Sequence, residues 1–236
     1  MATPLFTYFQ GRIPLRRHEH VAVLYRGRAE AFSAASFLAE GLKGNDLCVY
    51  LAPDDYQAQM LDRLRSLPVD VDRNTSDGSF RLHHGFDNFQ SLQEWTQTIF
   101  ADAERAAPSV RWLEEGLWTT PVGFPLAYFF EFHALLNYQV KHYPSVALCQ
   151  YDLEQIAIND LLTAIAVHRH LLVEGALVRD NPFYIPAEKF LPLSPLERER
   201  DLLRLFRDVQ FDVRKLLAAL AGYARVQQAL SKSPEF

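Results

Sequence analysis

Acidic and phenolic side chains follow four predicted strands of this chain, at the point where each strand ends. They are Tyr25, then Asp54 with Asp55, then Glu114 with Glu115, and finally Tyr151 with Asp152. The carboxyl ends of parallel strands meet at one edge of an open sheet, and ligands bind in the crevice outside that edge. Carboxylates and phenols form directional hydrogen bonds. The sequence therefore indicates a binding site for a small polar molecule at this edge.

Glu115 has the most specific position of these residues, because it ends its strand where an ATPase core carries a magnesium-binding acid. A nucleotide site also needs a phosphate loop with several glycines and a Lys-Ser/Thr pair. After the first of these strands, residues 26–32 contain one glycine, Gly27, and no lysine. The scaffold is similar to an ATPase core that lacks the phosphate loop. We interpret Glu115 as a hydrogen-bond partner of a small ligand, or as a support for Tyr151.

Three other chemistries have weaker signals. A hydrolase could use paired carboxylates from Glu115, Glu131 and Asp152, but the sequence does not fix the separation that such chemistry requires. The eight histidines include the pair His18 and His20, yet no Cys/His set has the spacing of a structural zinc site. No Gly-x-Ser-x-Gly motif is present. We therefore expect no enzymatic activity, no metal ion and no cofactor.

The helix expected over residues 125–142 begins with an aromatic run, Phe124-Pro-Leu-Ala-Tyr-Phe-Phe-Glu-Phe-His133. Core packing explains such a run. Alternatively, the helix forms the apolar wall of a small-molecule pocket, with Glu131 as its polar group and with Trp118 and Tyr128 shaping the wall. Both interpretations remain open at this point.

Short apolar runs alternate with segments of helical period, which favours an α/β fold with a mostly parallel sheet and helices on both faces. Expected strands cover residues 21–25, 47–52, 80–83, 110–115, 146–151 and 171–178. Expected helices cover residues 29–42, 56–66, 92–106, 125–142 and 159–168. Residues 74–78 and 119–123 have the composition of turns.

The last part of the chain is expected to be one long helix. Three prolines make residues 181–192 irregular, and Ser194-Pro-Leu-Glu197 is a capping box with proline at the first helical position. Steps of four and three then define a coiled-coil seam through Leu202, Phe206, Val209, Val213, Leu216, Leu220, Tyr223, Gln227 and Leu230. Pairing with a second copy is the expectation; the alternative is a helix that folds back on its own domain. We divide the chain into an α/β domain, 1–192, and a helical extension, 193–236.

Composition limits the compartment and the partners. The net charge is −5 and no basic tract is present, so direct binding of nucleic acid has no electrostatic support. No apolar run approaches the roughly 20 residues of a membrane span, and the first residues do not have the pattern of a signal peptide. Cys48 and Cys149 both lie in apolar strand-like runs, as buried free thiols do. We expect a cytoplasmic protein without a membrane partner.

Several motifs occur together in a fixed order. They are His20-x4-Tyr25, Phe37-Leu-x-x-Gly41-Leu, Gly44-Asn-Asp-Leu-Cys-Val-Tyr50, Glu115-x-x-Trp118, Glu131, Cys149-Gln-Tyr-Asp152, Asn181-Pro-Phe-Tyr-Ile-Pro186 and Glu188-x-Phe190-Leu191. With them, the chain from about His20 to Leu191 resembles the MEDS domain, a sensory module of bacterial and archaeal signalling proteins. That family is related to RecA/KaiC-like ATPase cores without a phosphate loop, so the resemblance implies a RecA-like fold.

The resemblance also implies a function. MEDS domains are proposed to sense simple hydrocarbon derivatives and to signal to a kinase, an anti-sigma type ATPase or a DNA-binding domain. The implied site residues are His20, Tyr25, Glu115, Trp118, Glu131, Cys149, Tyr151 and Asp152. His168 is followed by Arg169 and so departs from the family's His-Pro pattern. Our hypothesis is a non-enzymatic sensor of a small organic ligand that signals through its C-terminal helix or a partner; the alternative is a ligand-free scaffold.

Overall fold

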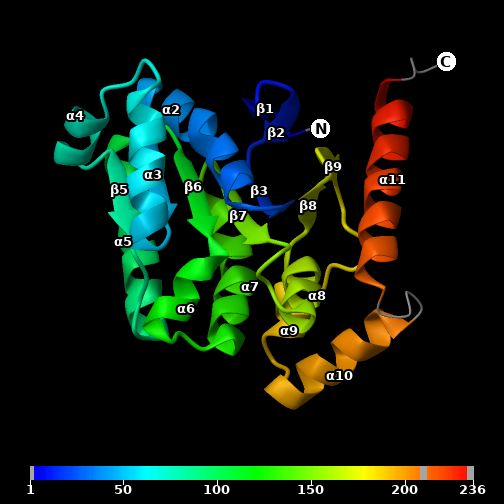
Figure 1. The fold of residues 1–236 in the computed structure, drawn as a ribbon. Coiled ribbons are helices and arrows are strands. Elements are labelled where there is room, and N and C mark those ends of the chain that lie inside the picture. The colour runs from blue at the N-terminus through cyan, green and yellow to red at the C-terminus, as the bar shows by residue number, and fades with distance from the viewer. Residues whose placement is uncertain (1–2, 208–211, 233–236) are drawn as a thin grey trace.

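A seven-stranded sheet forms the centre of the molecule in this computed structural model, which describes residues 3–207 and 212–232 (Figure 1). The strand order is β5-β4-β6-β7-β3-β8-β9. The strands are β3 (Glu19–Tyr25), β4 (Leu47–Leu51), β5 (Phe80–His83), β6 (Val110–Glu115), β7 (Ser145–Asp152), β8 (His170–Val173) and β9 (Ala176–Val178). All neighbours pair in parallel except β8 and β9. The mostly parallel, RecA-like α/β fold is confirmed.

Helices cover both faces of the sheet, which explains why its central strands are apolar along their whole length. Alternate side chains of a strand point to opposite faces. Cys48 and Tyr50 therefore pack with α2 (Ala35–Lys43), α3 (Asp54–Arg65) and α4 (Val71–Ser76). Val49 and Leu51 belong to the other hydrophobic cluster, which is formed with α5 (Phe89–Ala106), α7 (Leu126–His142) and α8 (Ile158–Val167).

The connections between strands create a crevice at the carboxyl edge of the sheet. The chain leaves β3 through α1 (Arg28–Ala31), a 3-10 turn (Phe32–Ala34) and α2, on one face. It leaves β6 through a second 3-10 turn (Gly116–Trp118), α6 (Thr119–Val122) and α7, and it leaves β7 through α8, on the other face. Because β7 lies between β3 and β6, neighbouring strands send their connections to opposite faces there. Open α/β sheets bind ligands at such a point.

Three local expectations are wrong. Residues 171–178 form the hairpin β8–β9 rather than one strand, because Glu174 and Gly175 adopt positive φ angles of 49° and 71° in a two-residue turn. Residues 74–78 were expected to form a turn, but α4 reaches Ser76 and is capped by the Asp70 side chain, which accepts from the Arg73 N–H. Residues 119–123 contain the one-turn helix α6, which ends at Gly123 in the left-handed conformation.

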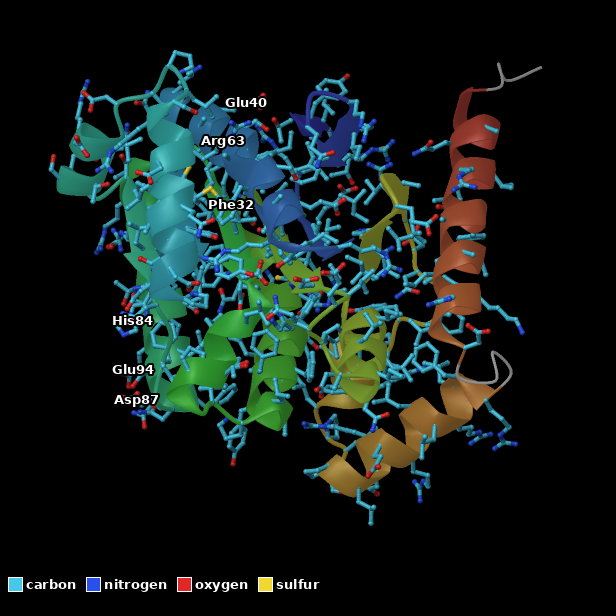
Figure 2. The ribbon with its side chains drawn as sticks, viewed as in Figure 1. Phe32, Glu40, Arg63, His84, Asp87 and Glu94 are labelled. Carbon is cyan, nitrogen blue, oxygen red and sulfur yellow. The ribbon has the colours of Figure 1, made fainter. Side chains whose placement is uncertain are left out.

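An N-terminal hairpin, β1 (Leu5–Phe9) and β2 (Ile13–Arg16), was not predicted. It packs beside α2, where Thr7 donates a hydrogen bond to Glu40 (labelled in Figure 2). Phe9, Ile13 and Leu15 are buried in the same cluster as α2 and α3. The hairpin therefore adds to the core at the end of the molecule opposite the carboxyl edge.

The C-terminal segment forms two described helices, α10 (Pro195–Leu205) and α11 (Val213–Lys232), rather than one. The capping box at Ser194 and Glu197 is confirmed. Part of the expected pairing seam is buried within the chain: α11 lies along β9, with Leu216 and Leu220 in the core cluster (Figure 1), whereas Tyr223 of the seam is exposed. Val209 and the side chain of Leu230 lie outside the described residues. The division at residue 192 stays a prediction.

Gln227 of α11 shows how this helix closes the edge of the sheet. Its side-chain amide donates to the Arg179 carbonyl at 2.8 Å and accepts from the Arg179 N–H at 3.1 Å. Arg179 directly follows β9, so the amide pairs with the backbone as another strand would. Among the described residues, no helix combines the length and apolarity that crossing a membrane requires.

Candidate functional site

A pocket of about 170 Å³ lies at the carboxyl ends of β6 and β7. Its apolar wall comes from the start of α7 and from the loop before α8. Its polar lining comes from the ends of the two strands. The lining residues are Glu115, Gly116, Leu117, Thr119, Thr120, Leu126, Phe129, Phe130, Gln150, Tyr151, Asp152, Gln155, Ile156, Ala157 and Asp160. This is the edge at which the sequence predicted a binding site.

Glu115 is fully buried in this lining and keeps one oxygen free. Its Oε2 accepts a hydrogen bond of 2.7 Å from the Tyr25 hydroxyl, whereas its Oε1 has no hydrogen-bond partner among the described residues. Burial raises the pKa of Glu115 to about 8, and the nearby Asp152 charge acts in the same direction. At neutral pH the carboxyl group is therefore mostly protonated. Its partner is Tyr25 and not Tyr151, so the expected support for Tyr151 is absent.

Gln150 and Tyr151 carry two further buried oxygens without partners in the described part of the chain. Gln150 lies opposite Glu115 in the register of β6 and β7. Its amide donates to the Ala31 carbonyl at 2.9 Å, which fixes Oε1 as a free acceptor. The Tyr151 hydroxyl is buried beside α7, and burial raises its pKa. A Cβ on residue 116 would lie 3.2 Å from the Tyr151 ring. The ring can pack this closely against the backbone because residue 116 is a glycine.

Asp152 closes the place where a phosphate loop would lie. Its Oδ1 accepts from the Gly27 N–H at 3.1 Å and from the Glu154 N–H at 3.0 Å, and its Oδ2 accepts from Gln155 at 2.9 Å. A Cβ on Gly27 would lie 3.6 Å from the Glu154 carboxylate. A phosphate loop presents free backbone N–H groups to an anion. Here a carboxylate already holds the Gly27 N–H, and a second one lies beside it.

Next to the pocket, four buried side chains form a compact cluster: His20, His133, Cys149 and His168. One donor atom from each lies within 4.8 Å of the others. Tyr151 stands between this cluster and the pocket, with its ring 5.7 Å from that of His168 and 6.2 Å from that of His133. The sequence shows no Cys/His set with the spacing of a structural zinc site, yet the fold gathers these four donors from residues that are far apart in the chain. The expectation of no metal ion stays a prediction.

Six of the nine predicted site residues lie outside the pocket lining. Tyr25 reaches the pocket only through its bond to Glu115, and His20 and Cys149 belong to the cluster described above. The other three lie elsewhere. Trp118 is fully buried and donates to Glu114 at 2.7 Å. Tyr128 is half-exposed on the outer side of α7, and Glu131 pairs with Arg198 of α10 at 3.3 Å. Phe129 and Phe130 form the apolar wall that we expected from Trp118 and Tyr128. Glu131 does not join Glu115 and Asp152, which both line the pocket, so the set of three carboxylates is not assembled.

Glu114, the neighbour of Glu115, faces the opposite side of the sheet. It accepts hydrogen bonds from Trp112 at 3.0 Å and from Trp118 at 2.7 Å. Burial raises its pKa to about 7, while the two indole donors oppose that shift. Its Oε1 also lies 3.7 Å from His133 Nε2. Glu114 therefore belongs to the surroundings of the His/Cys cluster and not to the pocket.

Sequence reasoning missed two kinds of functional residue. Gln150 was overlooked because it lies inside an apolar strand, although an amide in such a strand is itself a signal of a buried polar contact. His133 and Asn137 are four residues apart on α7 and so share a helix face. Two polar residues on one face of an otherwise aromatic helix also indicate a buried polar contact on α7.

Comparisons with known proteins agree with this architecture. The family model described as the methanogen/methylotroph, DcmR sensory domain (MEDS) matches residues 19–169, which is more than half of the chain. The transcriptional repressor DcmR of Methylorubrum extorquens is 25% identical over 154 residues, which cover 64% of this chain and 58% of that protein. The chain thus spans less than two thirds of the length of that curated relative.

Proposed function

Because the chain belongs to the MEDS family of sensory domains, we propose that it senses a small organic molecule bound in the pocket beside Glu115 and Tyr151. One observation carries this proposal: Glu115, Gln150 and Tyr151 line one pocket, and each buries an oxygen without a hydrogen-bond partner in the described structure. Buried polar groups that lack partners are rare in native proteins. The side chains of Glu115 and Gln150 lie on one face of the sheet and that of Tyr151 on the other, and their free oxygens are buried. We propose that ligand entry moves the lining side chains and gives these oxygens partners.

The chemistry of the pocket favours a ligand with a hydroxyl group. The Tyr25 hydroxyl donates to Oε2 of Glu115, so the proton of the neutral carboxyl group belongs on Oε1, which becomes a donor. The neighbouring Gln150 Oε1 is an acceptor. A hydroxyl both accepts and donates, and it therefore complements this pair. An alkane satisfies neither residue.

The size and charge of the pocket restrict the ligand further. A cavity of about 150 Å³ lined by apolar side chains binds benzene, so the observed 170 Å³ suits a molecule of a few carbon atoms. Asp152 and Asp160 line the same pocket, and they disfavour carboxylates and phosphates. A small neutral hydrocarbon derivative fits best, in agreement with the expectation from the sequence.

The route of the signal is part of the proposal. A second groove of about 200 Å³ lies beneath α10 and shares Leu126, Phe130 and Asp160 with the ligand pocket. Arg198 holds α10 over this groove through Glu131 and through the carbonyls of Phe190 and Leu191. Movement of the shared residues on ligand binding would change the docking of α10. We propose α10 as the output element, in place of a coiled coil through α11.

The output itself follows by analogy with the matched relative, which is a transcriptional repressor. We propose a kinase, an anti-sigma protein or a DNA-binding protein as the partner that receives the signal. We place this sensor in the cytoplasm, since Cys48 and Cys149 are buried free thiols. No catalytic step is proposed for it.

A melting-temperature screen of the full chain tests the proposal. The panel contains short alcohols, matched alkanes and halogenated hydrocarbons, short carboxylates, and ATP, each at millimolar concentration. An alcohol at 100 times its dissociation constant adds about 2.7 kcal/mol of stability, or several degrees. We expect shifts with alcohols and none with carboxylates or ATP. The absence of a shift across the whole panel would favour the ligand-free scaffold.

A further inference from the structure

The His/Cys cluster brings together donors from four separate segments of the chain. His20 lies on β3, His133 on α7, Cys149 on β7, and His168 directly after α8. All four are at least 98% buried. Three imidazoles and one thiol are the ligands that zinc prefers in proteins, and together they complete a tetrahedral set. The cluster has no role in the pocket lining described above.

Two of the distances between donor atoms already match those between the ligand atoms of a tetrahedral metal site. Zinc–nitrogen bonds of about 2.0 Å and zinc–sulfur bonds of about 2.3 Å place neighbouring ligand atoms about 3.3–3.6 Å apart. His20 Nε2 lies 3.2 Å from Cys149 Sγ, and His133 Nδ1 lies 3.5 Å from the same sulfur. The widest separation in the set is 4.8 Å. Small rotations of the side chains close the remaining gap.

Two of the three imidazoles, those of His20 and His168, have their second nitrogen hydrogen-bonded, as metal-binding histidines do, whereas His133 Nε2 has no hydrogen-bond partner among the described residues. His20 Nδ1 lies 3.2 Å from the Asn137 side-chain oxygen, and His168 Nδ1 lies 2.7 Å from the Ala164 carbonyl. These contacts leave the Nε2 atoms for a metal, and His168 Nε2 has no other partner within the described residues. His133 Nε2 lies 3.7 Å from Glu114 Oε1, which leaves Nδ1 to face Cys149.

We propose that His20, His133, Cys149 and His168 bind one first-row transition-metal ion, with zinc as the best match. The imidazoles donate neutral lone pairs, and the thiol of Cys149 releases its proton to solvent when the sulfur–metal bond forms. The thiolate and the Glu114 carboxylate balance the charge of a divalent ion. With four protein ligands the site is closed, which is typical of structural rather than catalytic zinc.

Such a metal site would hold Tyr151, which lines the ligand pocket, in a fixed position. The metal would join β3, β7, α7 and the end of α8, and Tyr151 follows Cys149 by two residues on β7. This inference does not depend on the proposed ligand function. A metal could be present in a chain that binds no alcohol, and the pocket could bind an alcohol without a metal.

Metal analysis of the full chain tests the proposal directly. The protein is purified without a nickel column, and zinc, copper, nickel, cobalt and iron are measured by mass spectrometry. We expect about one equivalent of one of these metals in the wild type and less than a tenth of that in Cys149→Ser. Cys48→Ser is the matched control, because Cys48 is equally buried in a central strand but lies outside the cluster. It should keep the full equivalent.

Cobalt titration keeps the proposal testable even if Cys149→Ser fails to fold. The wild type is stripped with a chelator and titrated with Co²⁺, and the absorption of a cobalt–thiolate bond is recorded. We expect saturation at one equivalent, the same spectrum in Cys48→Ser, and a melting temperature several degrees higher with metal. Less than a tenth of an equivalent in the wild type, together with no cobalt–thiolate absorption, would overturn the inference. So would equal metal content in Cys149→Ser.

Discussion

At the scale of single residues, Glu115 determines how the pocket responds to pH. Its carboxyl group is buried, shares a hydrogen bond with Tyr25, and has a pKa raised to about 8. The neutral acid is a hydrogen-bond donor, whereas the carboxylate is an acceptor only. In the proposed sensor, Glu115 would therefore offer a donor to a ligand hydroxyl below about pH 8 and lose it above that pH.

The same raised pKa makes the stability of the protein pH-dependent. Below pH 4.5, the ordinary value, Glu115 is protonated in both the folded and the unfolded chain. Between pH 4.5 and 8 the unfolded chain ionises first, so the free energy of unfolding falls by up to about 1.4 kcal/mol per pH unit. Glu115→Gln keeps an acceptor for Tyr25 but does not titrate. We expect this variant to gain stability over the wild type as the pH rises from 5 to 8.

Urea denaturation at pH 5, 6, 7 and 8 measures this difference. Glu131→Gln is the control, because Glu131 is only partly buried and pairs with Arg198 on the surface of α7. The loss of this ion pair gives the reference against which the effect of Glu115→Gln is read. Parallel pH profiles for the wild type and Glu115→Gln would show that burial does not raise the pKa of this carboxyl group.

At the scale of the elements, a close contact joins α2 to the sheet. Gly41 on α2 faces Arg111 of β6 and Cys48 of β4, and a Cβ there would lie 2.7 Å from Cys48 Sγ. Arg111 cannot retreat easily, since it is buried and bonds Asp46 at 2.7 Å and the Phe37 carbonyl at 2.8 Å. The helix therefore packs at this distance from the sheet because residue 41 has no side chain.

Gly41→Ala should destabilise the protein by about 1–3 kcal/mol, as overpacking of a dense core does. Gly222→Ala is the matched control, because Gly222 also lies inside a helix, but a Cβ there would meet no heavy atom of the surrounding structure within 4 Å. That substitution should stabilise by up to about 1 kcal/mol through helix propensity. Thermal unfolding of both variants gives the comparison. Equal effects of the two substitutions would contradict the packing described for α2.

The packing of α11 supports a second prediction at this scale. Leu220 is buried in the core cluster, whereas Tyr223, one turn further, is exposed. Leu220→Ala should cost about 2–5 kcal/mol, and Tyr223→Ala should change stability by about 0.5 kcal/mol or less. Neither should alter the oligomeric state. Light scattering and urea denaturation test this. A loss of oligomers in Leu220→Ala at unchanged stability would restore the coiled-coil interpretation.

At the scale of the whole molecule, the order of the main elements could be predicted from the sequence. Apolar runs marked the central strands, because strands covered on both faces must be apolar throughout. The hairpins β1–β2 and β8–β9 were missed, since both depend on short turns such as Glu174-Gly175. The packing of α11 against β9 of its own chain was the second of two interpretations and not the expected one. A stripe of apolar residues on a helix does not show whether the helix packs against another chain or against the sheet of its own chain.

Part of the candidate site could also be predicted from the sequence, and part could not. Residues at strand ends, such as Glu115 and Tyr151, were found because parallel strands present their carboxyl ends together. The His/Cys cluster was not found, because His20 and Cys149 are 129 positions apart and His133 lies on a helix between them. Only the arrangement of neighbouring strands β3 and β7, with α7 packed on them, brings these donors together.

An NMR titration of the full chain with 1-propanol, in the wild type and two variants, tests the central claim most directly. The hydroxyls of Tyr151 and Tyr50 are both buried without partners in the described structure, but Tyr50 does not line the pocket. Both Tyr→Phe variants should therefore remain folded. We predict saturable 1:1 binding that is about tenfold weaker in Tyr151→Phe and unchanged in Tyr50→Phe. No saturable binding to the wild type, or equal affinity in both variants, would contradict the account.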